Sequence, residues 1–311
     1  MFPDNNWYGH RYIILQYLKK KDKEIFASLQ HGWISQYLKK QNYKKKNYPI
    51  LCWSKKNKLF YTTKNIKNVN SIGSPFLYLC KMMEEKKYKL NKPPPKGTMV
   101  FPTHSSQDLE HFTNHEQLIN DVQSDFEGPY TVCFYYYDLN KKDIDLYKKK
   151  NWKVVCCVRG KADKLSLFRL YREISKNEYI ISGEFSSALF YGMYLRKKTR
   201  VYFNSNKRYL SYTKEELEMV ELYKKNYPEL FSRYLSPEKG KILGDLELGF
   251  ESIKDKEQLV KLLGCNSIIK NFFSKILSKL YDLKYGSGLR RGIDLSKDEL
   301  LKYISVARSS D

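Results

Sequence analysis

The chain has 311 residues and a formal net charge of +23, from 57 lysines and arginines against 34 aspartates and glutamates. Its hydrophobic content of 41% supports buried cores, while no apolar run approaches the length of a transmembrane helix and the first ten residues do not resemble a signal peptide. The charge favours an anionic substrate, a polyanion or an anionic lipid surface, and its lysines are dispersed along the chain.

The cysteines are typical of a reducing compartment. No pair of them has the spacing of a metal site, and three lie in apolar, strand-like runs. We therefore expect all six to be reduced and structural, in a cytoplasmic protein. They are Cys52, Cys80, Cys133, Cys156, Cys157 and Cys265.

The first third of the chain predicts an α/β unit. A helical period over Tyr12–Leu18 is followed by strand-like runs and then by a helix that begins at Ser74 and Pro75, a capping residue and a proline. The strand-like runs are Ile25–Leu29, Pro49–Trp53, Asn68–Ile72 and, more weakly, Leu59–Thr62. Three prolines at 93–95 form a stiff spacer, so we predict a first domain over residues 1–94.

A second alternating series predicts a parallel sheet covered by helices on both faces. Its strands are Thr98–Phe101, Tyr130–Tyr137, Lys153–Val158, Tyr179–Ser182 and Thr199–Phe203. The helices between them are Asn114–Val122, Lys141–Lys150, Lys164–Lys176 and one that opens at Ser186. This series gives a second domain over residues 95–205.

Residues 206–311 are predicted to form a helical C-terminal extension. Lys214–Lys225 has helical character, Gly240–Phe250 is expected to be a loop or linker, and Ile268–Leu280 carries an apolar stripe. The stripe fits a helix that packs on the main body or one that touches an anionic membrane. The predicted fold class is α/β, with two Rossmann-like domains, a central cleft and C-terminal helices.

Polar clusters follow five of the predicted strands. Ligands of open α/β sheets bind beyond the carboxyl ends of the strands, so clusters from both series indicate a cleft between two sheets. The residues are His31 and Gly32; Ser74; His104, Ser105 and Ser106; Arg159; and Ser182, Glu184, Ser186 and Ser187.

Two of these positions mark the start of a helix. Ser186 and Ser187 stand where free N–H groups and the positive end of the helix dipole can hold a phosphate, although both could equally be ordinary helix caps. Arg159 could bind a phosphate or a carboxylate, or could be a solvated loop residue. The sequence leaves these alternatives open.

Histidines and carboxylates supply the candidates for proton transfer. His31 and His104 each follow a strand, and an imidazole there can move a proton or stabilise a phosphate. His10 is a weaker candidate, and His111 and His115 are expected at the surface. The candidate general bases are Asp4, Asp108, Glu110 and Glu184.

Several common site motifs are missing from the sequence. It contains no GxxxxGK[ST] phosphate loop, no GxGxxG and no GxSxG. The sequence DID at 143–145 lies in a predicted helix rather than at a strand end, which argues mildly against a metal-dependent sugar transferase.

These features resemble the GT-B class of glycosyltransferases. The sequence QHGW at 30–33 is similar to the strand-end His-Gly element of bacterial surface-polymer transferases. EFSS at 184–187 resembles the Ser-Ser motif of bacterial sialyltransferases and the D-[YF]-S-S motif of CDP-glycerol glycerophosphotransferases. FPTHS at 101–105 stands where those families carry a His-Pro element, here in the order Pro-Thr-His.

The resemblance implies a metal-independent, inverting transferase of bacterial capsule or lipopolysaccharide biosynthesis, cytoplasmic and peripheral on the inner membrane face. Its donor would be a nucleotide-sugar, with a CMP-linked acidic sugar favoured and a CDP-linked polyol phosphate as the alternative, and its acceptor a glycan or lipid-linked glycan. No cofactor is implied. A nucleic-acid-binding protein and a non-catalytic scaffold are further alternatives.

The resemblance also divides the candidate residues by role. The catalytic residues would be His31, His104 and Glu184. The donor phosphate would lie against Ser105, Ser106, Arg159, Ser182, Ser186 and Ser187. The acceptor side would include His10, Gly32 and Ser74, and no residue is assigned to a metal.

Overall fold

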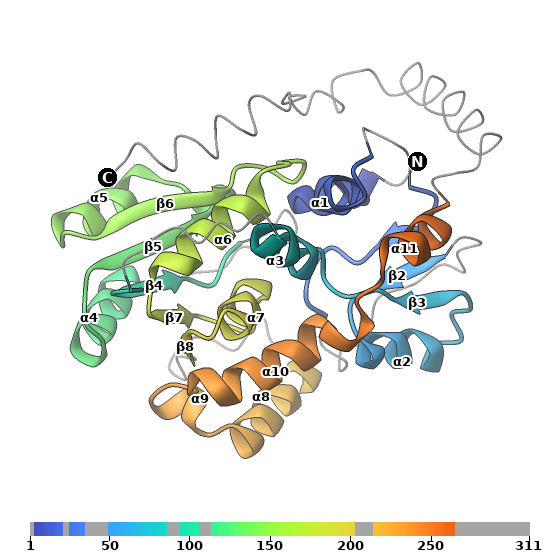
Figure 1. Ribbon diagram of the computed structural model, residues 1–311. Helices are drawn as coiled ribbons and strands as arrows, with labels where there is room; N and C mark the ends of the chain where they lie inside the picture. The colour runs from blue at the N-terminus through green and yellow to red at the C-terminus, as the bar shows by residue number, and fades with distance from the viewer. Residues whose placement is uncertain are drawn as a thin grey trace.

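The computed structural model describes residues 3–20, 25–34, 49–85, 94–105, 113–202 and 214–264. They form two parallel sheets with helices packed around them (Figure 1). The first sheet runs in the order β1 (Ser28–Leu29), β2 (Ile50–Cys52) and β3 (Val69–Ser71). Its helical neighbours are η1 (Pro3–Gly9), α1 (His10–Tyr17), α2 (Lys55–Thr63) and α3 (Pro75–Glu85).

The second sheet has five strands in the order β6-β5-β4-β7-β8, all parallel. They are β4 (Thr98–Phe101), β5 (Tyr130–Tyr135), β6 (Lys153–Val158), β7 (Tyr179–Ser182) and β8 (Lys198–Val201). Counted within the sheet this order is 3-2-1-4-5, the doubly wound order of Rossmann folds. Its topological switch point therefore lies between β4 and β7.

Helices cover both faces of this second sheet. Neighbouring residues of each strand point to opposite faces, and apolar side chains on both faces are buried against helices. Val100 and Ile181 pack in one cluster with residues of α4 (His115–Asp125) and α5 (Lys141–Lys149). Met99 and Ile180 pack in another with residues of α6 (Ser166–Lys176) and α7 (Ser187–Tyr194). A short 3-10 turn, η2 (Tyr136–Asp138), follows β5.

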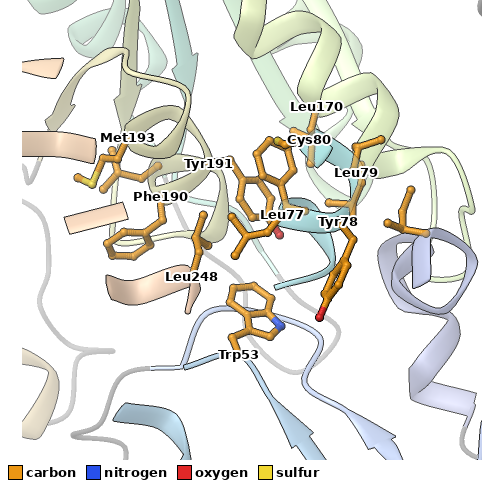
Figure 2. Close-up of a cluster of buried hydrophobic side chains, with 14 of the residues drawn as sticks. Trp53, Leu77, Tyr78, Leu79, Cys80, Leu170, Phe190, Tyr191, Met193 and Leu248 are labelled. Atoms are coloured by element: carbon orange, nitrogen blue, oxygen red, sulfur yellow. The ribbon is translucent and has the colours of Figure 1, made fainter. Parts of the chain in front are cut away.

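The core on the α7 side is shared by both sheets (Figure 2). The ring of Phe76, on α3, stacks on that of Tyr191, on α7, with centroids 4.0 Å apart and planes 11° apart. Trp53, which follows β2, lies 6.4 Å from the same Tyr191 ring. One continuous apolar core therefore extends across both sheets.

The C-terminal helices connect the two sheets a second time. They are α8 (Lys214–Asn226), α9 (Glu229–Ser232), α10 (Pro237–Leu248), η4 (Phe250–Ser252) and α11 (Lys256–Leu263). α10 lies along α7 (Figure 1), and its end reaches the first sheet, where the Ser74 N–H donates to the Leu248 carbonyl at 2.8 Å. The Phe26 N–H, next to β1, donates to the Leu263 carbonyl of α11 at 2.9 Å.

The predicted α/β class is confirmed: the chain has two parallel sheets, each with helices beside it, and further helices toward the C-terminus. The domain bounds at residues 94 and 205 stay predictions, and the stripe over Ile268–Leu280 lies outside the described residues. Of the cysteines within the described ranges, Cys156 is half-buried and the others are buried.

Two predicted elements were wrong. Leu59–Thr62 is not a strand but part of α2, which begins where the Ser54 hydroxyl accepts the Asn57 N–H. Gly240–Phe250 is not a loop, because most of it belongs to α10. Its glycines permit close contact with α7: a Cβ on Gly244 would come within 2.8 Å of the Tyr194 nitrogen.

A buried carboxylate ties these parts together. Glu247 of α10 is 2% exposed, and it accepts hydrogen bonds from the Trp33 indole at 2.8 Å and from the Tyr223 hydroxyl at 2.8 Å. The Lys56 ammonium lies 2.5 Å from the same carboxylate. Trp33 follows β1, Lys56 is on α2 and Tyr223 is on α8, so one carboxylate connects the first sheet to the C-terminal helices.

We expect Glu247→Ala to lower the free energy of unfolding by about 3 kcal/mol or more, because it removes the buried acceptor of an indole N–H, a phenol and a partly buried ammonium. Urea denaturation of the purified protein measures this loss. The matched control is Glu251→Ala, since Glu251 pairs with Lys55 at the surface, with side chains 50% and 69% exposed. That variant should lose less than about 1 kcal/mol. Equal losses in the two variants would contradict a central role for Glu247.

Candidate active site

A cavity of about 280 Å³ lies at the switch point of the second sheet, near the lower end of the size range of small-molecule sites. Its wall includes residues at the ends of β1, β4, β5, β6 and β7, at the start of α7 and in η1. The five strand ends belong to both sheets, so the cavity is the cleft that the strand-end clusters predicted. The predicted residues in its wall are His10, His31, Gly32, His104, Ser182, Glu184, Ser186 and Ser187.

The loops after β4 and β7 touch each other at the base of the cavity. The Gly183 N–H donates to the Phe101 carbonyl at 2.8 Å. A Cβ on Gly183 would come within 2.6 Å of the Thr103 hydroxyl and 2.7 Å of its nitrogen, so only glycine permits this approach. The contact places His104 and Glu184 on two neighbouring loops of the same cavity.

The N-terminus of α7 forms part of the wall. The Ser186 hydroxyl caps the helix by accepting the Leu189 N–H at 3.3 Å, and it also contacts the buried Ser182 hydroxyl at 3.2 Å. The N–H groups of Ser187 and Ala188 belong to the first turn, where no acceptor exists within the helix. With the helix dipole, this turn favours an anion in the cavity.

Ser187 connects the two sheets as well as opening the helix. Its hydroxyl accepts the main-chain N–H of Trp33 at 2.9 Å. Ser74, which follows β3, is fully buried and is not among the residues that line the cavity. The hydroxyl of Ser187 is thus engaged in holding the two sides of the site together.

The turn that carries His31 is built by Gln30. The Gln30 amide donates to the Gly32 carbonyl at 2.8 Å and accepts the Trp53 N–H at 3.0 Å. These bonds fix the turn at the end of β1, and the His31 ring packs edge-on against Trp7 with centroids 4.5 Å apart. His31 therefore approaches the cavity from the side of the first sheet.

His10 is a buried, neutral histidine. It is 1% exposed, and its Nδ1 lies 3.3 Å from the Gln30 carbonyl, which is the geometry of a donated N–H. Burial lowers the pKa of His10 to about 3, and the charge of the nearby His31 opposes its protonation further. Its part in the site is to hold the turn around His31.

His104 lies at the mouth of the cavity and is exposed. Its ring packs against Tyr135 with centroids 4.6 Å apart, and its Nδ1 lies 3.1 Å from the Ser105 carbonyl. If that carbonyl receives Nδ1–H, Nε2 is left as an acceptor, or as a donor when the ring is charged. The Ser105 N–H in turn donates to the Asp138 carboxylate at 3.1 Å, which ties this loop to η2.

Three predicted residues lie away from the cavity wall. Arg159 is exposed, and its main-chain N–H donates to Asp163 at 2.9 Å. Ser105 and Ser74 stand behind the wall, and Ser106 lies outside the described residues. The expectation that His115 is at the surface was wrong, since it is only 12% exposed and hydrogen-bonds to the buried Tyr147 at 3.0 Å. His111 lies outside the described residues.

The sequence reasoning missed three aromatic hydroxyls in the wall, those of Tyr8, Tyr135 and Tyr191. Tyr135 is the last residue of β5, so the strand-end rule would have found it had the strand not been extended to residue 137. Tyr8 and Tyr191 could not be found by this rule, because Tyr8 comes shortly before α1 and Tyr191 lies inside α7, so neither follows a strand.

Searches by sequence find no counterpart for this chain. No family model matches it. No curated protein matches it either.

Solved structures show weak likeness. A variant of the wall teichoic acid polymerase TagF has 14% identity and a TM-score of 0.35, over 75% of this chain and 58% of that one. UDP-GlcNAc 2-epimerase from Neisseria meningitidis, bound to UDP-GlcNAc, has 11% identity and a TM-score of 0.33, over 74% of this chain and 61% of that one. UGT89C1 from Arabidopsis thaliana, complexed with UDP, has 10% identity and a TM-score of 0.36, over 83% and 66%.

The chain thus spans less than two thirds of each of these three structures. Likeness at this level does not indicate what the chain binds.

Ser187→Ala removes the acceptor of the Trp33 N–H, and we expect it to lower the free energy of unfolding by about 1–3 kcal/mol. Chemical denaturation measures the loss, with Ser175→Ala as the control. The Ser175 hydroxyl donates to the Tyr171 carbonyl of its own helix, so its removal should cost less. A Ser187→Ala protein as stable as wild type would show that this tie between the sheets is weak.

The buried His10 also predicts a pH dependence. Its folded-state pKa of about 3 is below the ordinary 6.5, so its contribution to stability is complete above pH 6.5 and is lost as the pH falls toward 3. Between pH 7.5 and 5, wild type should lose about 2 kcal/mol more than His10→Gln, which keeps an amide donor and cannot become charged. Urea denaturation at the two pH values tests this, and equal losses would contradict it.

Proposed function

We propose that this protein is a glycosyltransferase that uses a nucleotide-linked sugar donor. The observation that carries the proposal is the cavity itself, which lies at the switch point of a 3-2-1-4-5 sheet and has the N-terminus of α7 in its wall. Open parallel sheets bind nucleotides at this place, and a helix N-terminus there favours a phosphate. The first sheet supplies the facing wall, where an acceptor would approach.

In this proposal the donor phosphate lies against the first turn of α7. The N–H groups of Ser187 and Ala188 and the helix dipole stabilise the charge that grows on the nucleotide phosphate as its bond to the sugar breaks. His104 stands at the mouth of the same cavity, where a charged imidazole would add to that stabilisation. These groups would perform the electrostatic work without a metal.

The acceptor hydroxyl would attack the anomeric carbon from the side of the first sheet. One bond forms between the acceptor oxygen and that carbon while the carbon–oxygen bond to the phosphate breaks, with inversion. A general base takes the proton of the acceptor hydroxyl. His31 and Glu184 line the cavity from its two sides and are the candidates for this base.

We favour a CMP-linked acidic sugar as the donor and a glycan as the acceptor, in the assembly of a bacterial surface polysaccharide. The net charge of +23 would assist binding of an acidic donor and contact with an anionic membrane surface. No helix in the described parts of the chain is long and apolar enough to cross a bilayer. A CDP-linked polyol phosphate is the alternative donor.

Thermal denaturation with CMP, CDP, UDP, GDP or ADP tests this proposal, because a ligand of the native state raises the melting temperature. We expect a rise with CMP, and with the cytidine nucleotides only. Ala188→Asp should abolish it, since a carboxylate at the first turn repels a phosphate while it favours the helix itself. Ala188→Asn is the neutral control of similar size.

The nucleotide panel also separates the alternatives. A larger rise in melting temperature with CDP than with CMP would favour the CDP-linked donor over the CMP-linked one. A rise with UDP or GDP would show that the donor nucleotide is not a cytidine nucleotide. A rise in melting temperature that persists in Ala188→Asp would show that the phosphate does not bind at the first turn of α7. Stabilisation by generic oligonucleotides alone, weakening with salt, would overturn the proposal in favour of a nucleic-acid-binding protein.

A further inference from the structure

Two tyrosine hydroxyls meet in the wall of the cavity. Tyr8, in η1, and Tyr135, at the end of β5, have hydroxyl oxygens 3.1 Å apart, although 127 positions separate them in the chain. Both side chains are half-buried and line the cavity. The contact brings a residue from the start of the chain onto the carboxyl edge of the second sheet.

The backbone around Tyr8 is held in an unusual conformation to make this contact. Tyr8 has φ 55°, a left-handed value that a tyrosine rarely adopts, and Gly9 follows with φ 77°. The Tyr8 N–H donates to the Lys161 carbonyl at 2.8 Å, and a Cβ on Gly9 would lie 2.3 Å from the Lys164 carbonyl oxygen. Backbone outliers of this kind, fixed by their surroundings, are typical of ligand sites.

The pair has hydrogen-bonding capacity left over. Two phenols carry two protons, and their mutual bond uses one: where Tyr135 donates to Tyr8, the Tyr8 proton can be donated to a ligand. Burial raises the pKa of Tyr8 and that of Tyr135, so both hydroxyls stay protonated at neutral pH. Tyr191 of α7 lines the same cavity as the pair.

We propose that Tyr8 and Tyr135, here called the tyrosine pair, bind an anionic oxygen of the substrate where η1 meets the end of β5 in the cavity wall. The inference rests on the proposed function and extends it, since it adds a second anion-binding position to the cavity. The oxygen belongs either to the donor phosphate or to the carboxylate of an acidic sugar. His104, packed on the Tyr135 ring, would lie beside it.

Isothermal titration calorimetry with wild type, Tyr8→Phe and Tyr135→Phe tests this, because phenylalanine keeps the ring contacts and removes only the hydroxyl. The ligands are cytidine, CMP and a CMP-linked nonulosonic acid. A hydrogen bond to a charged oxygen corresponds to roughly a tenfold or greater loss of affinity when it is removed. Tyr137→Phe is the matched control, since Tyr137 belongs to the same run, is 43% exposed and lies outside the cavity wall.

The pattern across ligands assigns the oxygen. Loss of affinity for CMP and its sugar conjugate, with cytidine unchanged, places the phosphate on the pair; loss for the conjugate alone places the carboxylate there. Wild-type affinity for every ligand in both variants would overturn the inference and leave the proposed function standing. A wild-type protein that binds no nucleotide would overturn the proposed function, and the inference with it. Melting temperatures show whether either variant is misfolded, in which case the other decides.

Discussion

The architecture depends on one buried carboxylate. The Glu247 carboxylate binds the Trp33 indole, the Tyr223 hydroxyl and the Lys56 ammonium. These three groups come from segments that are far apart in the chain. A carboxylate can be buried only where its charge is compensated in this way. Trp33, which donates its indole N–H to Glu247, also donates its main-chain N–H to Ser187. The carboxylate on α10 therefore helps to position the wall of the cavity.

This arrangement explains why the cavity has a defined shape although its wall comes from many segments. Three segments of the wall are fixed by hydrogen bonds to other parts of the chain: Gly183 to Phe101, Ser105 to Asp138 and Tyr8 to Lys161. The side chains that face the cavity are therefore positioned before any ligand arrives. Preorganised dipoles stabilise developing charge better than groups that must first reorient.

Much of this organisation could be predicted from the sequence. Alternation of apolar strands and helices predicted both sheets, and the rule on strand ends predicted seven residues of the cavity wall. What could not be predicted depends on distant partners. Gly240 and Gly244 suggested a loop because their packing surface, α7, lies elsewhere in the chain. The sequence around Tyr8 does not indicate a site, because its place in the cavity depends on contact with Tyr135, 127 positions away. Arg159 follows a strand as predicted, but its side chain is exposed to solvent.

The stack of Phe76 on Tyr191 indicates that the parts of the chain before and after the proline spacer do not fold independently. Apolar surface that each half buries against the other would meet water if the chain were divided at the proline spacer, and burial of such surface is the main force that stabilises a fold. The halves therefore share their stability, and the protein should melt as a single cooperative unit rather than one half at a time. A fragment comprising either sheet alone would lack part of its own core.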